Sequence, residues 1–127
     1  LIQNSHVKVT AMDIDPKRKD VIKGDIMALP FEDKKYDAVV CSQVLEHLEN
    51  PIDAIAELKR VAKKQIIITV PNEPYFTLFR LGCWEKEHLW AITPRALKSL
   101  LGYPAKEGYI FFKRYYIAMW EIDNQDS

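Results

Sequence analysis

Acidic and polar residues stand where four apolar, strand-like segments of this sequence end. Asp13 stands next to the end of HVKVTAMDI, and Asp25 stands next to the end of DVIKGDI. Ser42 is the last residue of YDAVVCS and Gln43 follows it, and residues 71–72 follow QIIITV. In open α/β sheets, ligands bind beyond the carboxyl ends of the strands. We therefore expect these residues to line a ligand site.

The two acids suit the recognition of a nucleoside. An acidic residue that ends the second strand of a nucleotide-binding fold can accept hydrogen bonds from both ribose hydroxyls. Asp13 is the first candidate for this role and Asp15 the second. A carboxylate that ends the next strand, here Asp25, can accept from an adenine amino group while the N–H of Ile26 reaches a ring nitrogen. The alternative is that each acid only caps a turn, but the two in this order, followed by LPF, favour the nucleoside.

Apolar patterning predicts the elements that must position these residues. The predicted strands span residues 6–14, 20–26, 36–42 and 65–70, and the predicted helices span residues 51–64 and 93–102. Asn50 can cap the first helix, whose apolar face carries Ile52, Ile55, Leu58 and either Val61 or Ala62. Thr93 begins the second helix and Gly102 ends it.

The order of strand, helix and strand with short connections predicts one α/β domain over residues 1–127. The expected fold is a doubly wound, Rossmann-like, mostly parallel sheet in a three-layer α/β/α arrangement. The apolar strand 36–42 should be central. The aromatic tail 109–122 predicts one long strand or a tight hairpin at a sheet edge, and the aromatic segment 72–92 predicts an irregular cover.

The runs VTAMDIDP and GDIMALPFEDKKYDAVVCSQVLEHLENP resemble a class I, type 11 methyltransferase domain that depends on S-adenosylmethionine. ITVPN and HLWAITPRALKSLL are similar to the fifth strand and following helix of that family. The resemblance covers residues 6 to 102 and implies S-adenosylmethionine as the cofactor. The cofactor-binding residues that it implies are Asp13, Ile14, Asp25, Ile26, Ser42 and Gln43, the last two beside the methionine part and the transferred methyl group.

His47 and His88 are the candidate catalytic residues. Methyl transfer from a sulfonium depends mainly on alignment, and a general base is needed only if the acceptor must lose a proton. The alternatives are that His47 orients the next helix and that His88 is a polar residue of the covering segment. Aromatic residues of that segment could line a pocket for a lipid-like or quinone-like small-molecule acceptor: Tyr75, Phe76, Trp84 and Trp90.

Two departures from the family pattern concern the first half of the fold. The connection from Asp13 to Asp25 is too short for a full helix. The family's first strand and glycine-rich loop are absent, since the only glycines are at positions 24, 82, 102 and 108. In this topology the missing strand lies between the strands that end at Asp13 and Ser42. We therefore expect an N-terminally incomplete domain that is part of a longer polypeptide. A chain that truly lacked this strand would be unstable alone, would borrow a strand from a partner or in a homo-oligomer, or would pair its sheet differently.

Two other functions remain open. A methyltransferase-like binding or assembly subunit without catalysis would explain the missing loop. A nucleotide-dependent oxidoreductase shares the acid after the second strand, but the GD-x-x-x-LPF segment has no role in that chemistry.

Composition limits the partners. The chain has 18 basic and 18 acidic residues, so no net field attracts nucleic acid. Its apolar runs are far shorter than the roughly 20 residues of a membrane-spanning helix. Cys41 and Cys83 have no metal-ligand or disulfide spacing, which favours the cytoplasm and predicts no metal site.

Overall fold

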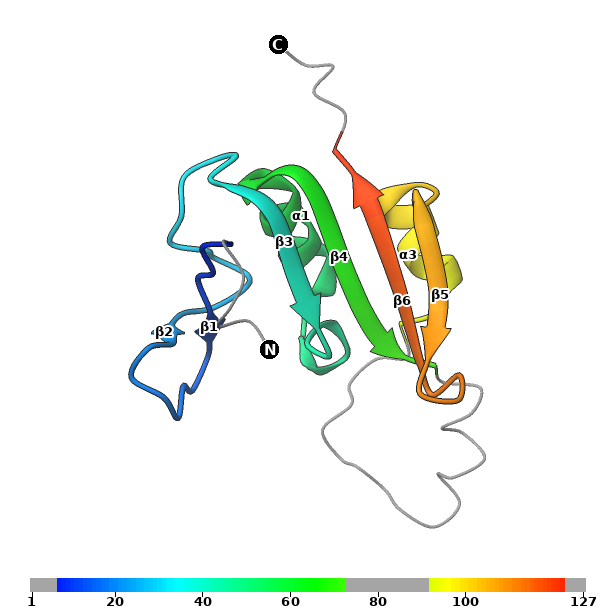
Figure 1. Ribbon diagram of the computed structural model, residues 1–127, viewed down its shortest axis with the longest axis horizontal. Coiled ribbons are helices and arrows are strands. Elements are labelled where there is room, and N and C mark those ends of the chain that lie inside the picture. Colours follow the sequence, from blue (N-terminus) through cyan, green and yellow to red (C-terminus); the bar gives the residue numbers. More distant parts are fainter. Residues whose placement is uncertain (1–6, 73–91, 123–127) are drawn as a thin grey trace.

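The computed structural model describes residues 7–72 and 92–122, which form a four-stranded sheet, a separate two-stranded ribbon and helices (Figure 1). The sheet has the order β3-β4-β6-β5 and the ribbon consists of β1 and β2. The strands are β1 (Met12–Asp13), β2 (Ile22–Lys23), β3 (Tyr36–Ser42), β4 (Ala62–Pro71), β5 (Lys106–Ile110) and β6 (Tyr115–Glu121). The helices are the 3-10 helix η1 (Leu45–His47), α1 (Pro51–Val61) and α3 (Pro94–Leu101).

The sheet is mixed. β3 and β4 are parallel and are joined through α1, whereas β6 is antiparallel to both of its neighbours, β4 and β5. The aromatic tail is therefore a hairpin, with β5 at the edge of the sheet and β6 inserted beside β4. The α/β, Rossmann-like class expected from the sequence is confirmed.

Local capping chemistry sets the ends of both α-helices. The Asn50 side chain accepts hydrogen bonds from the N–H groups of Ile52 and Asp53, and the Thr93 hydroxyl accepts one from Ala96. Helix α1 ends three residues earlier than predicted because β4 already begins at Ala62. Helix α3 ends at Gly102, whose φ of 80° is a conformation that glycine adopts more readily than other residues.

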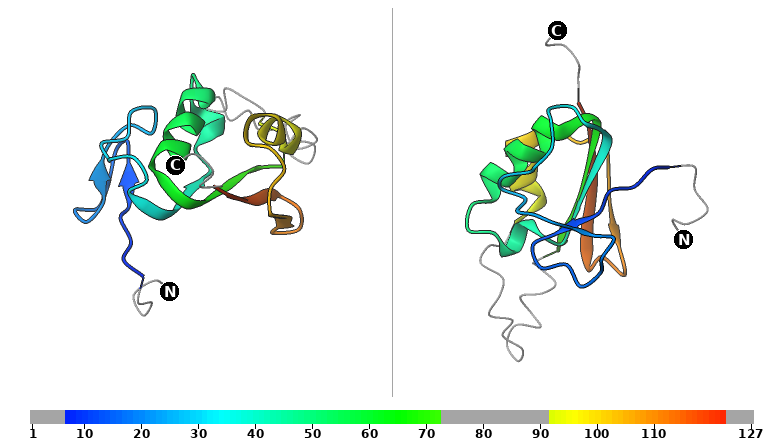
Figure 2. Two further views of the ribbon diagram at one scale, coloured as in Figure 1. Left: turned by 90° about the horizontal axis from the view of Figure 1, so that it is seen from above. Right: turned by 90° about the vertical axis from the view of Figure 1, so that its left-hand side faces the viewer.

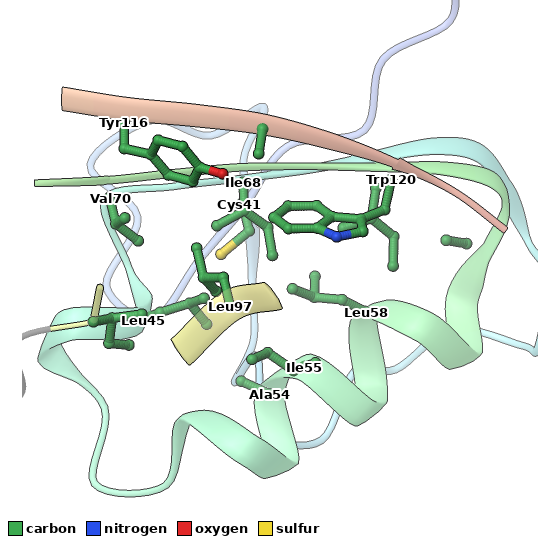
Figure 3. Close-up of a cluster of buried hydrophobic side chains, with 14 residues drawn as sticks. Cys41, Leu45, Ala54, Ile55, Leu58, Ile68, Val70, Leu97, Tyr116 and Trp120 are labelled. Atoms are coloured by element: carbon green, nitrogen blue, oxygen red, sulfur yellow. The ribbon is translucent and has the colours of Figure 1, made fainter. Parts of the chain in front are cut away.

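One face of the sheet carries the core. Ile66, Ile68 and Val70 of β4 alternate along that face and are all fully buried. Helices α1 and α3 both cover this face (Figure 2), and their side chains meet those of the strands in one cluster (Figure 3). The described residues thus form two layers of the expected three. Ile52, predicted on the apolar face of α1, is 59% exposed, because the buried stripe instead includes Ala54.

Strand β3 lies at the edge of the four-stranded sheet, not at its centre. Its only partner among the described strands is β4. Val40 points to the face opposite the core and is 64% exposed, which is unusual for a residue in so apolar a strand. The β1–β2 ribbon stands beyond this free edge (Figure 1).

The β1–β2 ribbon is much shorter than the predicted strands 6–14 and 20–26. Only Met12 and Asp13 pair with Ile22 and Lys23, in parallel. The residues between the two strands form bends and turns without a helix. A connection between parallel strands that contains a helix needs a dozen or more residues, and this connection is shorter. Among the described residues, no helix covers β1 and β2 is its only strand partner, so residues 7–11 lie exposed.

Candidate functional site

A hydroxyl cluster occupies the carboxyl edge of the parallel pair β3–β4. Ser42 and Thr69 are paired in register, and their hydroxyl oxygens lie 2.8 Å apart. The Gln43 side-chain amide donates to the Thr69 hydroxyl at 3.2 Å, and the Gln43 N–H donates to the Thr69 carbonyl at 3.1 Å. Gln43 has a positive φ of 54°, so the chain turns sharply there. The structure thus brings the predicted residues Ser42 and Gln43 together around Thr69.

Thr69 is a residue that the sequence interpretation missed. It lies within the apolar run QIIITV, where a threonine fits the strand pattern as a further β-branched residue. The available signal was that it is the polar residue nearest the end of a buried strand.

Asp13 stands at the end of β1 with its side chain exposed. One carboxylate oxygen accepts a hydrogen bond from the Asp15 N–H at 2.8 Å, and the Asp13 carbonyl accepts one from Gly24 at 3.0 Å. The turn-capping role considered for this acid is therefore observed. A solvent-accessible carboxylate with one backbone donor still has acceptor capacity for ligand hydroxyls. The Ile14 side chain next to it is 65% exposed.

Asp25 follows β2 and is half-buried. Its carboxylate accepts from the Met27 N–H at 2.9 Å, which again forms a capped turn. Ile26 and Met27 pack against the main core cluster, so this turn connects the ribbon to the sheet's helical face. A Cβ at Gly24 would lie 2.6 Å from the Met12 sulfur, so a larger residue there would force the Met12 side chain to move.

Arg60 of α1 holds the segment that carries the LPF motif. Its guanidinium donates to the carbonyls of Leu29 at 3.0 Å and Phe31 at 2.7 Å, and it pairs with Asp33 at 2.9 Å. Glu57 completes the contact, because its carboxylate binds Arg60 and accepts from the Leu29 N–H at 2.7 Å. The Arg60 side-chain hydrogen bond lowers the pKa of Glu57. The sequence analysis did not identify this anchor, because it depends on contacts between residues about 30 positions apart.

His47 ends η1, which begins shortly after Gln43, and its side chain is 39% exposed. Its Nε2 atom lies 3.8 Å from an oxygen of the neighbouring Glu46, a carboxylate that is buried. His47 is thus open to solvent on one side and faces a carboxylate on the other, an arrangement that a general base can use. His88 lies outside the described residues, as do Tyr75, Phe76, Trp84, Trp90 and most of the predicted covering segment.

Cys41 is buried beneath the carboxyl edge. Burial raises the pKa of its thiol to about 12, and the negative charge of Glu46 adds to the shift. The thiol therefore stays neutral at physiological pH, and a neutral, enclosed thiol is neither a nucleophile nor a metal ligand.

Asp13 and Asp25 belong to the ribbon, whose strands share no ladder with β3–β4, so the predicted site residues fall into two groups. Over residues 7–72 and 92–122 there is no group of three His, Cys, Asp or Glu residues that could hold a metal ion. None of the described helices is long and apolar enough to cross a bilayer.

The described residues form a Rossmann-like α/β fold with polar groups beyond its parallel strands and acids at the adjoining ribbon. The fold is similar to that of a solved S-adenosylmethionine-dependent methyltransferase from Thermotoga maritima, with a TM-score of 0.63, 16% identity, and 81% of this chain and 64% of that chain covered. A magnesium protoporphyrin IX methyltransferase from Synechocystis, solved with bound S-adenosylhomocysteine, has a TM-score of 0.58 at 20% identity over 80% of this chain and 49% of that chain.

Residues 2–69 match the family described as methyltransferase domain, and this chain belongs to that family. The resemblance to class I, type 11 methyltransferases is therefore confirmed. Among curated relatives, a demethylmenaquinone methyltransferase from Corynebacterium glutamicum is 34% identical over 99 residues, which cover 75% of this chain and 41% of the relative. The chain spans less than half the length of the first curated relatives that it matches.

Proposed function

We propose that this chain is the cofactor-side part of an S-adenosylmethionine-dependent methyltransferase that acts on a small-molecule acceptor. The observation that carries the proposal is the family match, which runs from before Asp13 to Thr69 and so includes both groups of site residues. The exposed acid on the ribbon and the hydroxyl cluster at the sheet edge are the residue types that such a cofactor needs.

In this proposal the ribbon binds the nucleoside. The exposed Asp13 carboxylate accepts hydrogen bonds from the ribose hydroxyls, and the backbone around Ile14 packs beside them. Asp25 and the N–H of Ile26 face the adenine edge. The turns at both acids support these roles, since the Asp15 and Met27 N–H groups fix the carboxylates in one orientation.

The hydroxyl cluster positions the reacting end. S-adenosylmethionine supplies a methyl group activated by its sulfonium, and alignment with the acceptor is the main requirement for transfer. Ser42 and Gln43 are held by Thr69 at the carboxyl edge, which restricts their rotamers before a ligand arrives. Preorganised polar groups of this kind orient a ligand without losing further side-chain entropy.

His47 is the proposed general base for acceptors that lose a proton, and its Nε2 atom lies 3.8 Å from a Glu46 carboxylate oxygen. His88 is kept as the second candidate base. The relatives named demethylmenaquinone methyltransferases support a quinone-like acceptor, which agrees with the aromatic composition of the segment before α3.

Isothermal titration calorimetry with S-adenosylmethionine tests the cofactor assignment. Asp13→Ala should weaken binding by about 10- to 100-fold, the range for losing hydrogen bonds to a charged group. The matched control is Asp20→Ala, which removes an equally exposed acid from the same region, one that is paired with Arg18. Absence of binding by the chain, or equal weakening by the two variants, would contradict the proposal.

A second candidate function is a methyltransferase-like binding or assembly subunit. The free edge of β3 favours it, because exposed strand edges pair with other chains. In either function we propose that a further strand, from another part of the polypeptide, from a partner or from a second copy, pairs with this edge. Analytical ultracentrifugation of the chain tests the second copy: self-association would support it, and a monomer would exclude it.

A further inference from the structure

The turn of the β5–β6 hairpin presents adjacent aromatic residues to solvent. Phe111 is 71% exposed and Phe112 is 102% exposed, and Tyr109 just before them is 50% exposed. Lys113 and Arg114, which complete the turn, are exposed as well. Single exposed apolar side chains are ordinary, but two adjacent phenylalanines at a hairpin tip form a patch. We call residues 109–114 the aromatic tip.

The backbone of the aromatic tip is unfavourable for the residues that it carries. Phe111, Phe112 and Lys113 have φ values of 50°, 55° and 61°. Left-handed backbone is disfavoured for residues with a Cβ, and hairpin turns that only reverse the chain use Gly, Asn or Asp there. Strained non-glycine residues concentrate at functional positions. Phenylalanine at two such positions therefore points to a role outside folding.

The aromatic tip is nevertheless held in place. The Asn72 side chain, which is 6% exposed, donates to the Lys113 carbonyl at 2.8 Å, and the Asn72 N–H donates to the Arg114 carbonyl at 2.9 Å. The Phe111 ring packs edge-on against Tyr115 with centroids 6.0 Å apart. The phenylalanines are thus presented by a fixed turn.

The aromatic tip lies at the same edge of the sheet as the hydroxyl cluster. Tyr115 pairs with Pro71 at the carboxyl end of β4, and Ile110 pairs with Tyr115, so the turn projects beyond the end of β4 (Figure 1). Asn72, which anchors the turn, directly follows β4. A surface bound by the tip would therefore face the edge where Ser42, Gln43 and Thr69 lie.

We propose that the aromatic tip docks this domain on an anionic lipid surface. Aromatic rings insert at the boundary between headgroups and acyl chains, while adjacent Lys and Arg side chains meet the lipid phosphates. The hairpin acid Glu107 does not offset these cations, because it already pairs with Lys98 and Tyr116. The chain as a whole has no net charge to add to this attraction, and because the Lys113 and Arg114 charges are exposed, salt screens it. Docking in this orientation brings the carboxyl edge to acceptors dissolved in the lipid, an advantage that rests on the proposed function.

Vesicle flotation of the chain tests the docking. Vesicles of phosphatidylcholine with about one-third phosphatidylserine are compared with phosphatidylcholine alone. The chain should float with the anionic vesicles and much less with the neutral ones. The double variant Phe111→Ser with Phe112→Ser should reduce the bound fraction at least about fivefold, and Lys113→Glu with Arg114→Glu should abolish the preference for anionic lipid.

Tyr103→Ser is the matched control. Tyr103 is 89% exposed and follows Gly102, whose carbonyl binds the Trp120 indole near the far end of β6. The control should bind vesicles as the parent chain does, and circular dichroism should show that all variants keep the fold. Absence of flotation by the parent chain, or equal flotation of the parent and the serine variant, would overturn the proposal. Self-association lost with the phenylalanines, without vesicle binding, would assign the tip to a second copy and also overturn it.

The flotation assay contains no S-adenosylmethionine, so its outcome is independent of the methyltransferase assignment. If the chain floats but shows no heat of cofactor binding, the docking proposal stands and the proposed function is contradicted. If the chain binds the cofactor but does not float, only the docking proposal is contradicted.

Discussion

The four-stranded sheet and the β1–β2 ribbon differ in how they are stabilised. Ile66, Ile68 and Val70 in the sheet are fully buried under two helices, whereas Val9 and Ile14 in and around the ribbon are 55% and 65% exposed. The sheet therefore supports itself by apolar burial, which contributes about 1.5–3 kcal/mol per large side chain. The ribbon, which carries both acids assigned to the nucleoside, has no core of its own.

Polar anchors on α1 hold the ribbon side instead. Arg60 binds the carbonyls of Leu29 and Phe31, and Glu57 binds the Leu29 N–H, while Ile26 packs on the core. The cofactor side is thus coupled to the sheet through one helix and a few directional contacts. We expect it to open at a lower free energy than the sheet, as regions with few apolar contacts do.

The largest expected effect is in the core of the sheet. Leu97→Ala removes a fully buried side chain between α3 and the strands and should lower the free energy of unfolding by about 2–5 kcal/mol. Leu100→Ala, on the same helix but 40% exposed, is the control and should cost clearly less. Urea denaturation measures both. Equal costs would show that the burial seen at α3 does not stabilise the fold.

Arg60→Ala should destabilise the ribbon side without destabilising the sheet. It removes both carbonyl contacts and the two ion pairs of the anchor, so amide hydrogen exchange should accelerate over residues 25–33 while β4 and β6 stay protected. Lys59→Ala, an exposed neighbour on α1, is the control. Uniform acceleration across the chain would mean that the ribbon and sheet unfold as one unit.

The cap of α1 should have an intermediate effect. Asn50→Ala leaves the N–H groups of Ile52 and Asp53 without their side-chain acceptor and should cost about 1 kcal/mol. Asn50→Ser, which keeps a capping oxygen, should recover most of that loss. Thermal unfolding of the two variants checks the order, and a serine variant as unstable as the alanine variant would contradict it.

Acid should weaken the anchor before the core. The Arg60 hydrogen bond holds the pKa of Glu57 below its ordinary value of 4.5 in the folded chain. A depressed pKa stabilises the fold above 4.5, and this contribution is lost as the pH falls through the lower folded value. The effect is small because the pair is partly solvated. Hydrogen exchange over residues 25–33, followed from pH 6 to 3, should show it, and Glu57→Gln should flatten that dependence.

The smallest effect is expected at the exposed apolar residues of the ribbon. Ile14→Ser should change the free energy of unfolding by less than about 0.5 kcal/mol, because its side chain is already 65% exposed. Ile68→Ser, in the core, is the contrasting variant and should unfold the chain or nearly so. A large loss with Ile14→Ser would show that another segment covers the ribbon in solution.

Elements with local signals were predicted well. Asn50, Thr93 and Gly102 mark helix ends through contacts within one turn, and the continuous apolar runs of β3 and β4 identify strands without knowledge of the rest of the chain. The buried, central position expected for β3 was wrong, because β3 lies at the edge of the described sheet and is buried only at Cys41. The ribbon strands were predicted too long, because the alternation of apolar residues over 6–14 shows only that this segment could form a strand. Whether a partner strand is present depends on residues far away.

The amino-acid sequence by itself determined the α/β class, the methyltransferase family and the polar residues that end each strand, because capping, alternation and short motifs are encoded locally. Only the tertiary structure decided that Thr69 joins Ser42 to Gln43 and that Arg60 anchors the LPF segment. It also decided that Val40 lies on an open face and that Phe112 is fully exposed to solvent. These outcomes depend on register, strand order and helix coverage, which are set by contacts between residues distant in the chain.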